Sequence, residues 1–444
     1  MKTLTSVLAL AGLAASAIAQ DFSGIDAVIN GAIARKVTPG AVAAFAIGDR
    51  LVYSRAYGSF TYGDKAPVTG SNPETQVDTK YDLASLTKVT TTTSCIATFY
   101  QRGELPLDTP LASPYLLGSA YANNGKSVIT VENCLLHNAG YPPDPDPMYW
   151  SSAFACPATG HQPVSEVFSC VDQAYDGLMK QTLINPPGAK YVYSDLSMIS
   201  LQYVVGTLAK NLGYIQPSQL HPSCAAALAA QGTSPPGSMS GLERSCYYEA
   251  YARHFVFEPL NMSVTGFLPP KDEWAAIPPT WQDTYYRDFW PQGQVSDENS
   301  YALGGIAGHA GVFSNVVDLM KLMQWLMHPP AASDVFLNAT TVDLFTTMHN
   351  VTQSSRALGW DTNSYVANTY RGCSNLSQNT FTHLGYTGTQ LCGDKDRKLI
   401  TILLTNRCYP DKTGGLTTIH PVRQQWNDAV LAVYNNITAA APLQ

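Results

Sequence analysis

The segment Tyr81-Asp82-Leu83-Ala84-Ser85-Leu86-Thr87-Lys88 carries a Ser-x-x-Lys motif directly before an apolar run at residues 89–100. This run has the length of a helix, and Gly103 would end it. At the start of such a helix, Ser85 and Lys88 would lie on one face. A lysine whose pKa is lowered by burial can take the proton of a serine hydroxyl, which is otherwise a poor nucleophile. The motif alone is weak, because about one match is expected by chance and a capped helix with a solvated lysine has the same pattern.

A second motif, Tyr193-Ser194-Asp195, follows a Pro-Pro-Gly turn at residues 186–188 and precedes apolar residues at helical spacing. Taken alone, it is typical of a turn that ends in an aspartate cap. The functional interpretation places the Tyr193 hydroxyl beside Ser85 and Lys88, where it would carry protons.

A third motif, His383-Leu384-Gly385-Tyr386-Thr387-Gly388-Thr389, is typical of a strand that enters a glycine turn. Such an edge could also supply a backbone N–H to an oxyanion, since glycine admits close approach. Residues 304–311 are glycine-rich but lack the Gly-x-Gly-x-x-Gly spacing and the Gly-Lys-Ser/Thr of nucleotide-binding loops. The chain also has no Gly-x-Ser-x-Gly elbow, which argues against an α/β-hydrolase.

Strand patterns gather at both ends of the chain. Residues 41–47 and 51–56 predict a hairpin, and residues 381–384, 390–392 and 399–406 predict three more strands. Apolar residues at helical spacing predict a first helix, which Ser23 would cap. They also predict a last helix, whose apolar face would be Val422, Trp426, Val430 and Val433.

A two-stranded hairpin is not stable alone, so the strands of both chain ends should share one sheet. We therefore expect an α/β plus all-α fold, in which an antiparallel sheet from both termini is flanked by helices and receives an inserted helical lobe. Residues 20–444 would form a single catalytic domain. Its α/β lobe would comprise residues 20–80 and 380–444, its mainly helical lobe would comprise residues 81–379, and a cleft would lie between them.

Composition excludes several classes of protein. The chain has 444 residues, of which 45% are hydrophobic and only 13% are charged, so it is not a disordered chain. Its net charge of −7 provides no basic patch, and we expect no nucleic-acid partner. No run of 18 apolar residues predicts a membrane span. With no Cys-x-x-Cys and no His-Glu-x-x-His motif, we expect no metal site and no cofactor.

The first residues predict export. Lys2 provides a positive start, residues 4–15 are apolar, and Ala17-Ile18-Ala19 fits a cleavage site. Residues 1–19 are therefore interpreted as a signal peptide rather than a buried first helix, and the protein is expected to be secreted. Five Asn-x-Ser/Thr sequons fit a glycosylated secreted protein; they are Asn261, Asn338, Asn350, Asn375 and Asn436.

Secretion makes disulfides the default interpretation of the nine cysteines. Spacing does not fix connectivity, and the pairs that it suggests are Cys156–Cys170, Cys224–Cys246 and Cys373–Cys392. The loops within the first two pairs would form pocket walls. The odd count leaves at least one free thiol. Cys95 is the candidate, with a buried inert thiol weighed against a reactive nucleophile.

In this order, the three motifs resemble the serine β-lactamase and D,D-peptidase superfamily, on its class C and esterase side. The resemblance covers nearly the whole chain after the signal peptide, from about Gly40 to Val430. Further segments that are similar to the family are residues 129–131, 137–140, 187–195, 259–262, 293–298, 308–314, 358–360 and 403–407.

The resemblance implies roles for the motif residues. Ser85 would form an acyl-enzyme, and Lys88 would be the first base or would tune Tyr193. Tyr193 would move protons to the leaving group and activate water. Beside Gly385, the N–H of Tyr386 would form an oxyanion hole together with the N–H of Ser85.

Three positions depart from the family pattern. Asp195 stands where β-lactamases carry asparagine; a carboxylate there would keep Lys88 charged, weaken it as a base and repel an anionic substrate group. His383 stands where many relatives carry lysine and would face the substrate. Its charge is lost as pH rises through the histidine range, so it would bind a substrate carboxylate more weakly. Ser296 stands where close relatives often have histidine.

We therefore expect a secreted serine hydrolase that forms an acyl-enzyme on small esters or amides. Esterase activity is expected first, then D-amino-acid peptidase, carboxypeptidase or weak β-lactamase activity. The substrate would be a small molecule or a short peptide with an acyl group, and acyl transfer to an alcohol or amine stays open. Aromatic segments around Trp150 and Trp281 suggest an apolar rim, although ordinary packing would explain them equally well. The alternative is a catalytically inactive binding or filament-forming member of the same fold.

Overall fold

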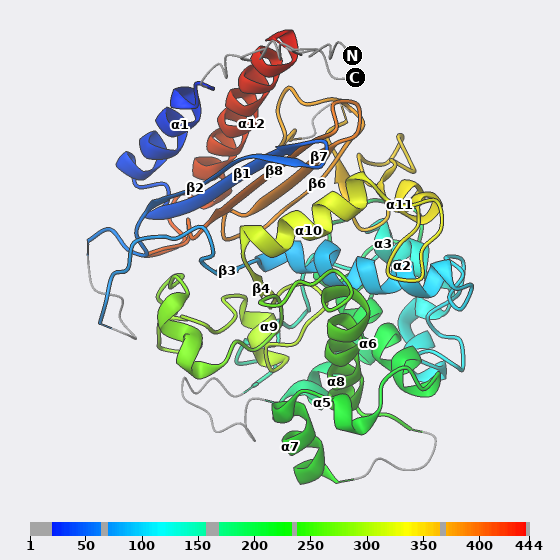
Figure 1. The fold of residues 1–444 in the computed structure, drawn as a ribbon. Coiled ribbons are helices and arrows are strands. Elements are labelled where there is room, and N and C mark those ends of the chain that lie inside the picture. Colours follow the sequence, from blue (N-terminus) through cyan, green and yellow to red (C-terminus); the bar gives the residue numbers. More distant parts are fainter. Residues whose placement is uncertain (1–19, 64–69, 157–167, 233–237, 365–369, 441–444) are drawn as a thin grey trace, which may run out of the picture.

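Both ends of the chain contribute to one antiparallel sheet of order β2-β1-β8-β7-β6-β5 (Figure 1). The structure is a computed structural model that describes residues 20–63, 70–156, 168–232, 238–364 and 370–440. The predicted signal peptide lies outside this part. The strands are β1 (Gly40–Ile47), β2 (Arg50–Gly58), β5 (Asp361–Thr362), β6 (Thr380–Leu384), β7 (Gln390–Asp394) and β8 (Leu399–Thr405). The predicted antiparallel sheet is confirmed, because β1 pairs along its length with β8.

The sheet separates two apolar cores. Side chains of a strand point alternately to opposite faces, so Ala43 and Phe45 of β1 enter the core under α1 (Ser23–Ala34) and α12 (Gly415–Ala440). Val42 and Ala44 enter the larger core, where α10 (Val316–Met327) packs on β8. Figure 1 shows the two terminal helices on one side of the sheet and α10 on the other. A strand that is buried on both faces is apolar throughout, as β1 is.

Helices and loops fill the middle of the chain. A two-stranded sheet of β3 (Tyr81–Asp82) and β4 (Phe313–Ser314) joins this part to the nucleophile motif. The helices are α2 (Ser94–Gln101), α3 (Val131–Leu135), α5 (Val171–Lys180), α6 (Asp195–Asn211), α7 (Pro222–Gln231), α8 (Gly241–Ala252), α9 (Glu298–Ala302) and α11 (Ala339–Thr346). Short 3-10 or π turns are η1 (Ala84–Leu86), η2 (Lys88–Thr93), η3 (Ser119–Val128), η4 (Pro217–Gln219), η5 (Arg253–Phe257) and η6 (Lys271–Ala276). Helix α6 is buried over most of its length and packs on α8.

One local expectation is wrong. Ser23 does not cap the first helix, because α1 begins at Ser23 itself and Phe22 precedes it. The Ser23 N–H instead donates to the Asp21 carboxylate at 2.8 Å. Asp21 therefore satisfies one of the N–H groups that every helix start leaves open. The buried face of α1 consists of Ile25, Ile29 and Ala32.

The three expected disulfides are present: Cys156–Cys170, Cys224–Cys246 and Cys373–Cys392. Cys95 is a buried free thiol, as expected, and so are Cys134 and Cys408. Burial raises the pKa of the Cys95 thiol, which favours the inert interpretation over a nucleophile. Within the described residues, no helix combines the length and the apolar character needed to cross a bilayer.

Candidate active site

Ser85 lies in a tight turn just before helix α2. Its neighbour Ala84 has a φ of 47°, in the left-handed region that residues with a side chain rarely adopt. The buried Asp82 carboxylate stabilises this turn, because it accepts the N–H of Ala84 at 2.8 Å and the N–H of Ser296 at 2.7 Å. Asp82 thus joins the serine turn to the loop before α9. Backbone strain of this kind is concentrated at functional sites.

Asp82 should be essential for the stability of this turn. In Asp82→Ala, two buried N–H groups lose their acceptor, and each such loss costs about 1–3 kcal/mol. We expect the free energy of unfolding, measured in urea, to fall by about 2–4 kcal/mol. The exposed Asp78→Ala is the matched control and should change it by less than about 0.5 kcal/mol. Equal stability of the two variants would contradict this role.

Lys88 is fully buried, and its ammonium contacts three partners. It donates to Ser85 Oγ at 2.9 Å and to the His309 carbonyl oxygen at 3.0 Å, and it pairs with Asp195 Oδ1 at 2.7 Å. Burial by itself lowers the pKa of Lys88, but the Asp195 carboxylate and the Tyr193 phenol outweigh it and raise the pKa above its ordinary value. The lysine beside the serine is therefore charged, as expected from Asp195.

Tyr193 is positioned by two extended segments that run side by side. The N–H of Val192 donates to the His137 carbonyl oxygen, and the N–H of Asp195 donates to the Pro143 carbonyl oxygen, both at 2.8 Å. The phenol ring then faces Lys88 Nζ, which lies 4.9 Å from the ring centre. The structure thus brings Ser85, Lys88, Tyr193 and Asp195 together although more than a hundred residues separate the first from the last.

The glycine turn after β6 lies against the serine turn. Thr387 Oγ1 donates to the carbonyl oxygen of Asp82 at 2.8 Å, and Thr389 Oγ1 donates to that of Leu83 at 3.1 Å. Gly385 permits this approach, because a Cβ there would lie 2.5 Å from the Leu83 oxygen. Its own N–H is used within the turn, where it donates to Thr389. The N–H of Tyr386 donates to no described group, and neither does the N–H of Ser85.

A cavity of about 400 Å³ opens in front of Ser85. The described residues that line it are Ala84, Ser85, Asp144, Met148, Trp150, Tyr193, Asp195, Trp281, Tyr285, Ser296, Asp297, Glu298, Asn299, Ala310, Tyr386 and Lys412. Trp150, Trp281 and Tyr285 from the expected aromatic segments are part of this lining, together with several carboxylates. The loop within the first disulfide lies almost entirely outside the described residues, and part of the second does too, so their expected place in the cavity wall stays a prediction. Most of the described wall comes from residues 144–150 and 281–299.

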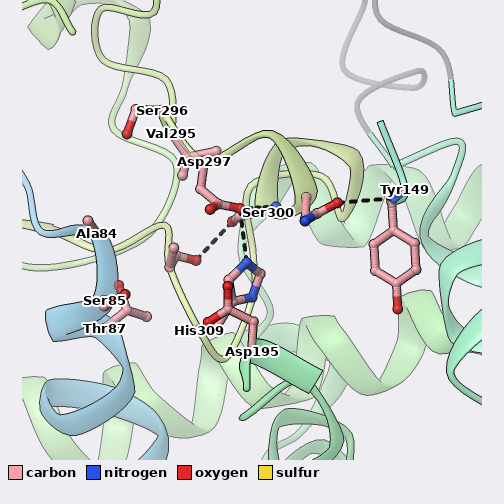
Figure 2. A network of polar contacts seen from close by, with 12 residues as sticks. Ala84, Ser85, Thr87, Tyr149, Asp195, Val295, Ser296, Asp297, Ser300 and His309 are labelled. Carbon is pink, nitrogen blue, oxygen red and sulfur yellow. Dashed lines mark hydrogen bonds and ion pairs between the residues drawn. The ribbon is translucent and has the colours of Figure 1, made fainter. Parts of the chain in front are cut away.

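His309 lies between the carboxylates of Asp195 and Asp297, both of which line the cavity (Figure 2). Its Nε2 donates to Asp297 Oδ1 at 2.9 Å, and Asp297 also accepts the N–H of Ser300 at the start of α9. Burial disfavours the charged ring, but Asp195 and Asp297 outweigh it and raise the pKa of His309. Gly308 makes the approach possible, because a Cβ there would lie 2.2 Å from a backbone oxygen of α6. One ligand atom each of Asp195, Asp297 and His309 lie within 4.8 Å of one another, so these residues could hold a metal ion, although the Lys88 ammonium already neutralises one of them.

His383 lies on β6 just before the glycine turn, and its ring centre is 6.3 Å from that of Tyr193. It is 3% exposed and is not part of the cavity lining. Its Nδ1 donates to the Leu384 carbonyl oxygen at 3.1 Å, and its Nε2 accepts from Arg356 Nη1 at 3.4 Å. Burial and the Arg356 guanidinium lower the pKa of His383 well below its ordinary value. The lowered pKa does not favour the expected positive charge on His383, and its role toward a substrate carboxylate stays a prediction.

Arg356 is the cation that lies behind Tyr193. Its guanidinium carbon lies 5.0 Å from the Tyr193 ring centre, and Nε donates to the Tyr191 hydroxyl at 3.2 Å. It also pairs with Asp361 on β5 at 3.5 Å. Sequence reasoning missed Arg356, whose only signal was its place just before the family-like segment 358–360.

Three further residues of the site were also missed by sequence reasoning. Asp297 and His309 lie inside family-like segments, at residues 293–298 and 308–314, so their position could have been noticed. Asp144 lies in the repeat Pro143-Asp144-Pro145-Asp146-Pro147, which carries no catalytic signature. Ser296 donates its backbone N–H to Asp82 and is part of the cavity wall, but neither observation explains why serine stands here.

Comparison with known proteins agrees with this arrangement. A family model described as "Beta-lactamase" matches residues 25–216 and 241–420. The chain is 27% identical over 372 residues to the Escherichia coli (strain K12) protein named "Putative D-alanyl-D-alanine carboxypeptidase", which covers 81% of this chain and 76% of that protein.

Solved structures share the fold at low sequence identity. "EstCE1, a hydrolase with promiscuous acyltransferase activity", is 17% identical with a TM-score of 0.63, covering 92% of this chain and 97% of that one. A class C beta lactamase from Rhodobacter sphaeroides is 16% identical with a TM-score of 0.58, covering 94% and 99%. The family model spans most of this chain, and Ser85 and Tyr193 of the Ser-x-x-Lys and tyrosine motifs line one cavity. The chain therefore belongs to the beta-lactamase family.

Proposed function

We propose that the protein is a serine hydrolase in which Ser85 forms an acyl-enzyme with small esters or amides. The observation that carries the proposal is the convergence of Ser85 Oγ, the Lys88 ammonium and the Tyr193 phenol beside one open cavity. A nucleophile, an orienting cation and a proton carrier are the parts that such a reaction needs.

Tyr193 would be the base, because Lys88 is already protonated. The Asp195 ion pair keeps the lysine charged, so it can donate to Ser85 Oγ but cannot accept its proton. Lys88 and Arg356 both lie near the Tyr193 ring, at 4.9 and 5.0 Å from its centre. These two cations would stabilise the negative charge of a phenolate that takes the serine proton.

Ser85 Oγ would then bond to the substrate carbonyl carbon, and the carbonyl oxygen would become an oxyanion. The N–H groups of Ser85 and Tyr386 are the candidate donors to that oxyanion, since neither is used by a described group. Tyr193 would pass its proton to the leaving oxygen or nitrogen as the bond to the carbonyl breaks. Water activated by Tyr193 would release the acid by the reverse sequence.

Esterase activity is proposed first, followed by D-amino-acid peptidase, carboxypeptidase or weak β-lactamase activity. Asp195 in place of the β-lactamase asparagine, and a neutral His383 outside the cavity, both disfavour a substrate carboxylate. The name of the Escherichia coli relative supports peptide substrates, whereas EstCE1 supports acyl transfer as well as hydrolysis. These two similarities favour a reaction that transfers an acyl group, but they do not identify the substrate.

Secretion is proposed from the predicted signal peptide and is supported by three disulfides. Among the proposed glycosylation sites, Asn261, Asn375 and Asn436 are exposed. Asn338 and Asn350 are half-buried, and their side chains accept hydrogen bonds from Thr341 and Thr352. Asn375 Nδ2, the atom that a glycan would join, donates to Asp428 Oδ1 at 2.9 Å, so modification would occur most readily at Asn261 and Asn436.

A fluorophosphonate probe tests the proposed function. The folded wild-type protein should be labelled, an excess of a p-nitrophenyl ester should slow the labelling, and Ser85→Ala should stay unlabelled. A folded wild-type protein that resists the probe and hydrolyses no ester would instead support the inactive binding or filament-forming alternative. Labelling that persists in Ser85→Ala would assign the nucleophile elsewhere.

A further inference from the structure

The wall of the cavity is strongly acidic. Four carboxylates line it, from Asp144, Asp195, Asp297 and Glu298, whereas Lys412 is the only lysine or arginine in the described lining. Three of the four carboxylates have a cationic partner: Asp195 pairs with Lys88, Asp297 with His309, and Glu298 with Lys412. The charges of those pairs offset one another, so the remaining charge depends on Asp144.

Asp144 has no partner among the described residues. It forms no ion pair and accepts no hydrogen bond there. The Asp195 N–H donates to the carbonyl oxygen of the preceding Pro143, which fixes Asp144 beside the start of α6. Burial, followed by repulsion from Asp195 and Asp297, raises the pKa of Asp144 to about 6. At neutral pH the cavity therefore holds one uncompensated carboxylate.

Lys412 shows how this wall binds a cation. Its ammonium lies 3.8 Å from the centre of the Trp281 ring, 3.0 Å from the Tyr285 hydroxyl and 2.5 Å from Glu298. An aromatic face with a nearby carboxylate is a good environment for an organic cation. Trp150 and Asp144 belong to the same lining, and Asp144 forms no ion pair among the described residues.

We propose that the cavity selects esters or amides that carry a protonated or quaternary amine, with Asp144 as the residue that receives its positive charge. This inference rests on the proposed function and specifies its substrate class. The same wall would disfavour substrates with a free carboxylate, such as peptides cleaved at their C-terminus. Lys88 and His309 also face this region, but both are held by other carboxylates.

Three p-nitrophenyl esters of equal chain length test the charge preference. They end in a trimethylammonium, a tert-butyl or a carboxylate group, so that the first two differ in charge but hardly in shape. We expect kcat/KM of wild type to be about tenfold higher for the cationic than for the neutral ester, and lowest for the anionic one. This preference should fall as pH drops below about 6, because Asp144 then becomes neutral.

Asp144→Asn should remove the preference. Its kcat/KM ratio of cationic to neutral ester should fall about tenfold, so that the variant hydrolyses the two esters with nearly equal kcat/KM. Asp146→Asn is the matched control, since it makes the same change two residues away, at an exposed position outside the cavity lining. It should keep the wild-type ratio. A wild type without preference, or an Asp144→Asn variant that keeps it, would overturn the proposal.

Binding separates this proposal from the proposed function. In Ser85→Ala, choline should change the tryptophan fluorescence at a lower concentration than its neutral isostere, 3,3-dimethylbutan-1-ol, and Asp144→Asn should abolish the difference. If no ester is hydrolysed but choline still binds through Asp144, the hydrolase proposal fails and the cation site stands. If the esters are hydrolysed but choline and the alcohol bind equally, the cation site fails and the hydrolase stands.

Discussion

Replacing Tyr193 by phenylalanine is expected to lower kcat by about a thousandfold while KM stays within about threefold of wild type. The phenol oxygen is the group that would take the Ser85 proton, because the Asp195 pair keeps Lys88 protonated. The ring itself would remain between Lys88 and Arg356, so substrate binding and packing should change little. Steady-state kinetics on p-nitrophenyl acetate measures both constants.

Tyr191→Phe is the matched control for this prediction. Tyr191 precedes Tyr193 by two residues, and its hydroxyl accepts from Arg356, but it is not part of the cavity lining. Its kcat should fall by less than about fivefold. A Tyr193→Phe variant with near-normal turnover would remove the tyrosine from the proton path and leave the site without an identified base.

Replacing Lys88 by methionine should lower kcat/KM by about a thousandfold and also destabilise the fold. The variant loses the donor to Ser85 Oγ and leaves the Asp195 carboxylate, 16% exposed, without its cation. Removing one partner of a buried ion pair costs about 3–5 kcal/mol. The two effects are read separately, from ester hydrolysis and from urea unfolding.

The double variant Lys88→Met/Asp195→Asn separates catalysis from stability. It removes the unpaired carboxylate, so most of the lost unfolding free energy should return, whereas kcat/KM should stay near that of Lys88→Met. A double variant that regains activity together with stability would mean that the lysine acts only through the fold.

Much of the fold could be predicted because its signals are local. The apolar runs that become β1 and β8 are buried on both faces, and the helices α1 and α12 carry single apolar faces. The run after Ser85 was predicted as a helix, and it starts with a 3-10 turn followed by a π turn over Lys88–Thr93. This stretch contains four threonines, and Thr90 Oγ1 donates to the Leu86 carbonyl oxygen at 2.9 Å. Side chains that compete for backbone groups in this way do not appear in an apolar pattern.

Contacts between residues of two recognised motifs could be predicted from the sequence. Contacts with residues of distant loops could not. The contact between Asp195 and Lys88 was expected from the motif order and is present. The pairing of His383 with Arg356 depends on how β5 and β6 align, with Asp361 opposite Thr382. That register brings a guanidinium to the histidine, and the sequence contains no sign of it. The acidic wall likewise depends on how the loops 144–150 and 293–299 pack beside Ser85, since they bring Asp144, Asp297 and Glu298 to the cavity.

The central claim is that a carbonyl substrate meets Ser85, Tyr193 and two free N–H groups in one cavity. A crystal structure of the protein inhibited by a phosphonate ester tests it most directly, because the phosphorus centre is tetrahedral like the acylation intermediate. We predict a bond from Ser85 Oγ to phosphorus, with one phosphonyl oxygen about 3 Å from the N–H groups of both Ser85 and Tyr386. The Tyr193 hydroxyl should face the position of the leaving group. A phosphonate attached to another residue, or bound to Ser85 with its oxygen turned away from both N–H groups, would contradict the account.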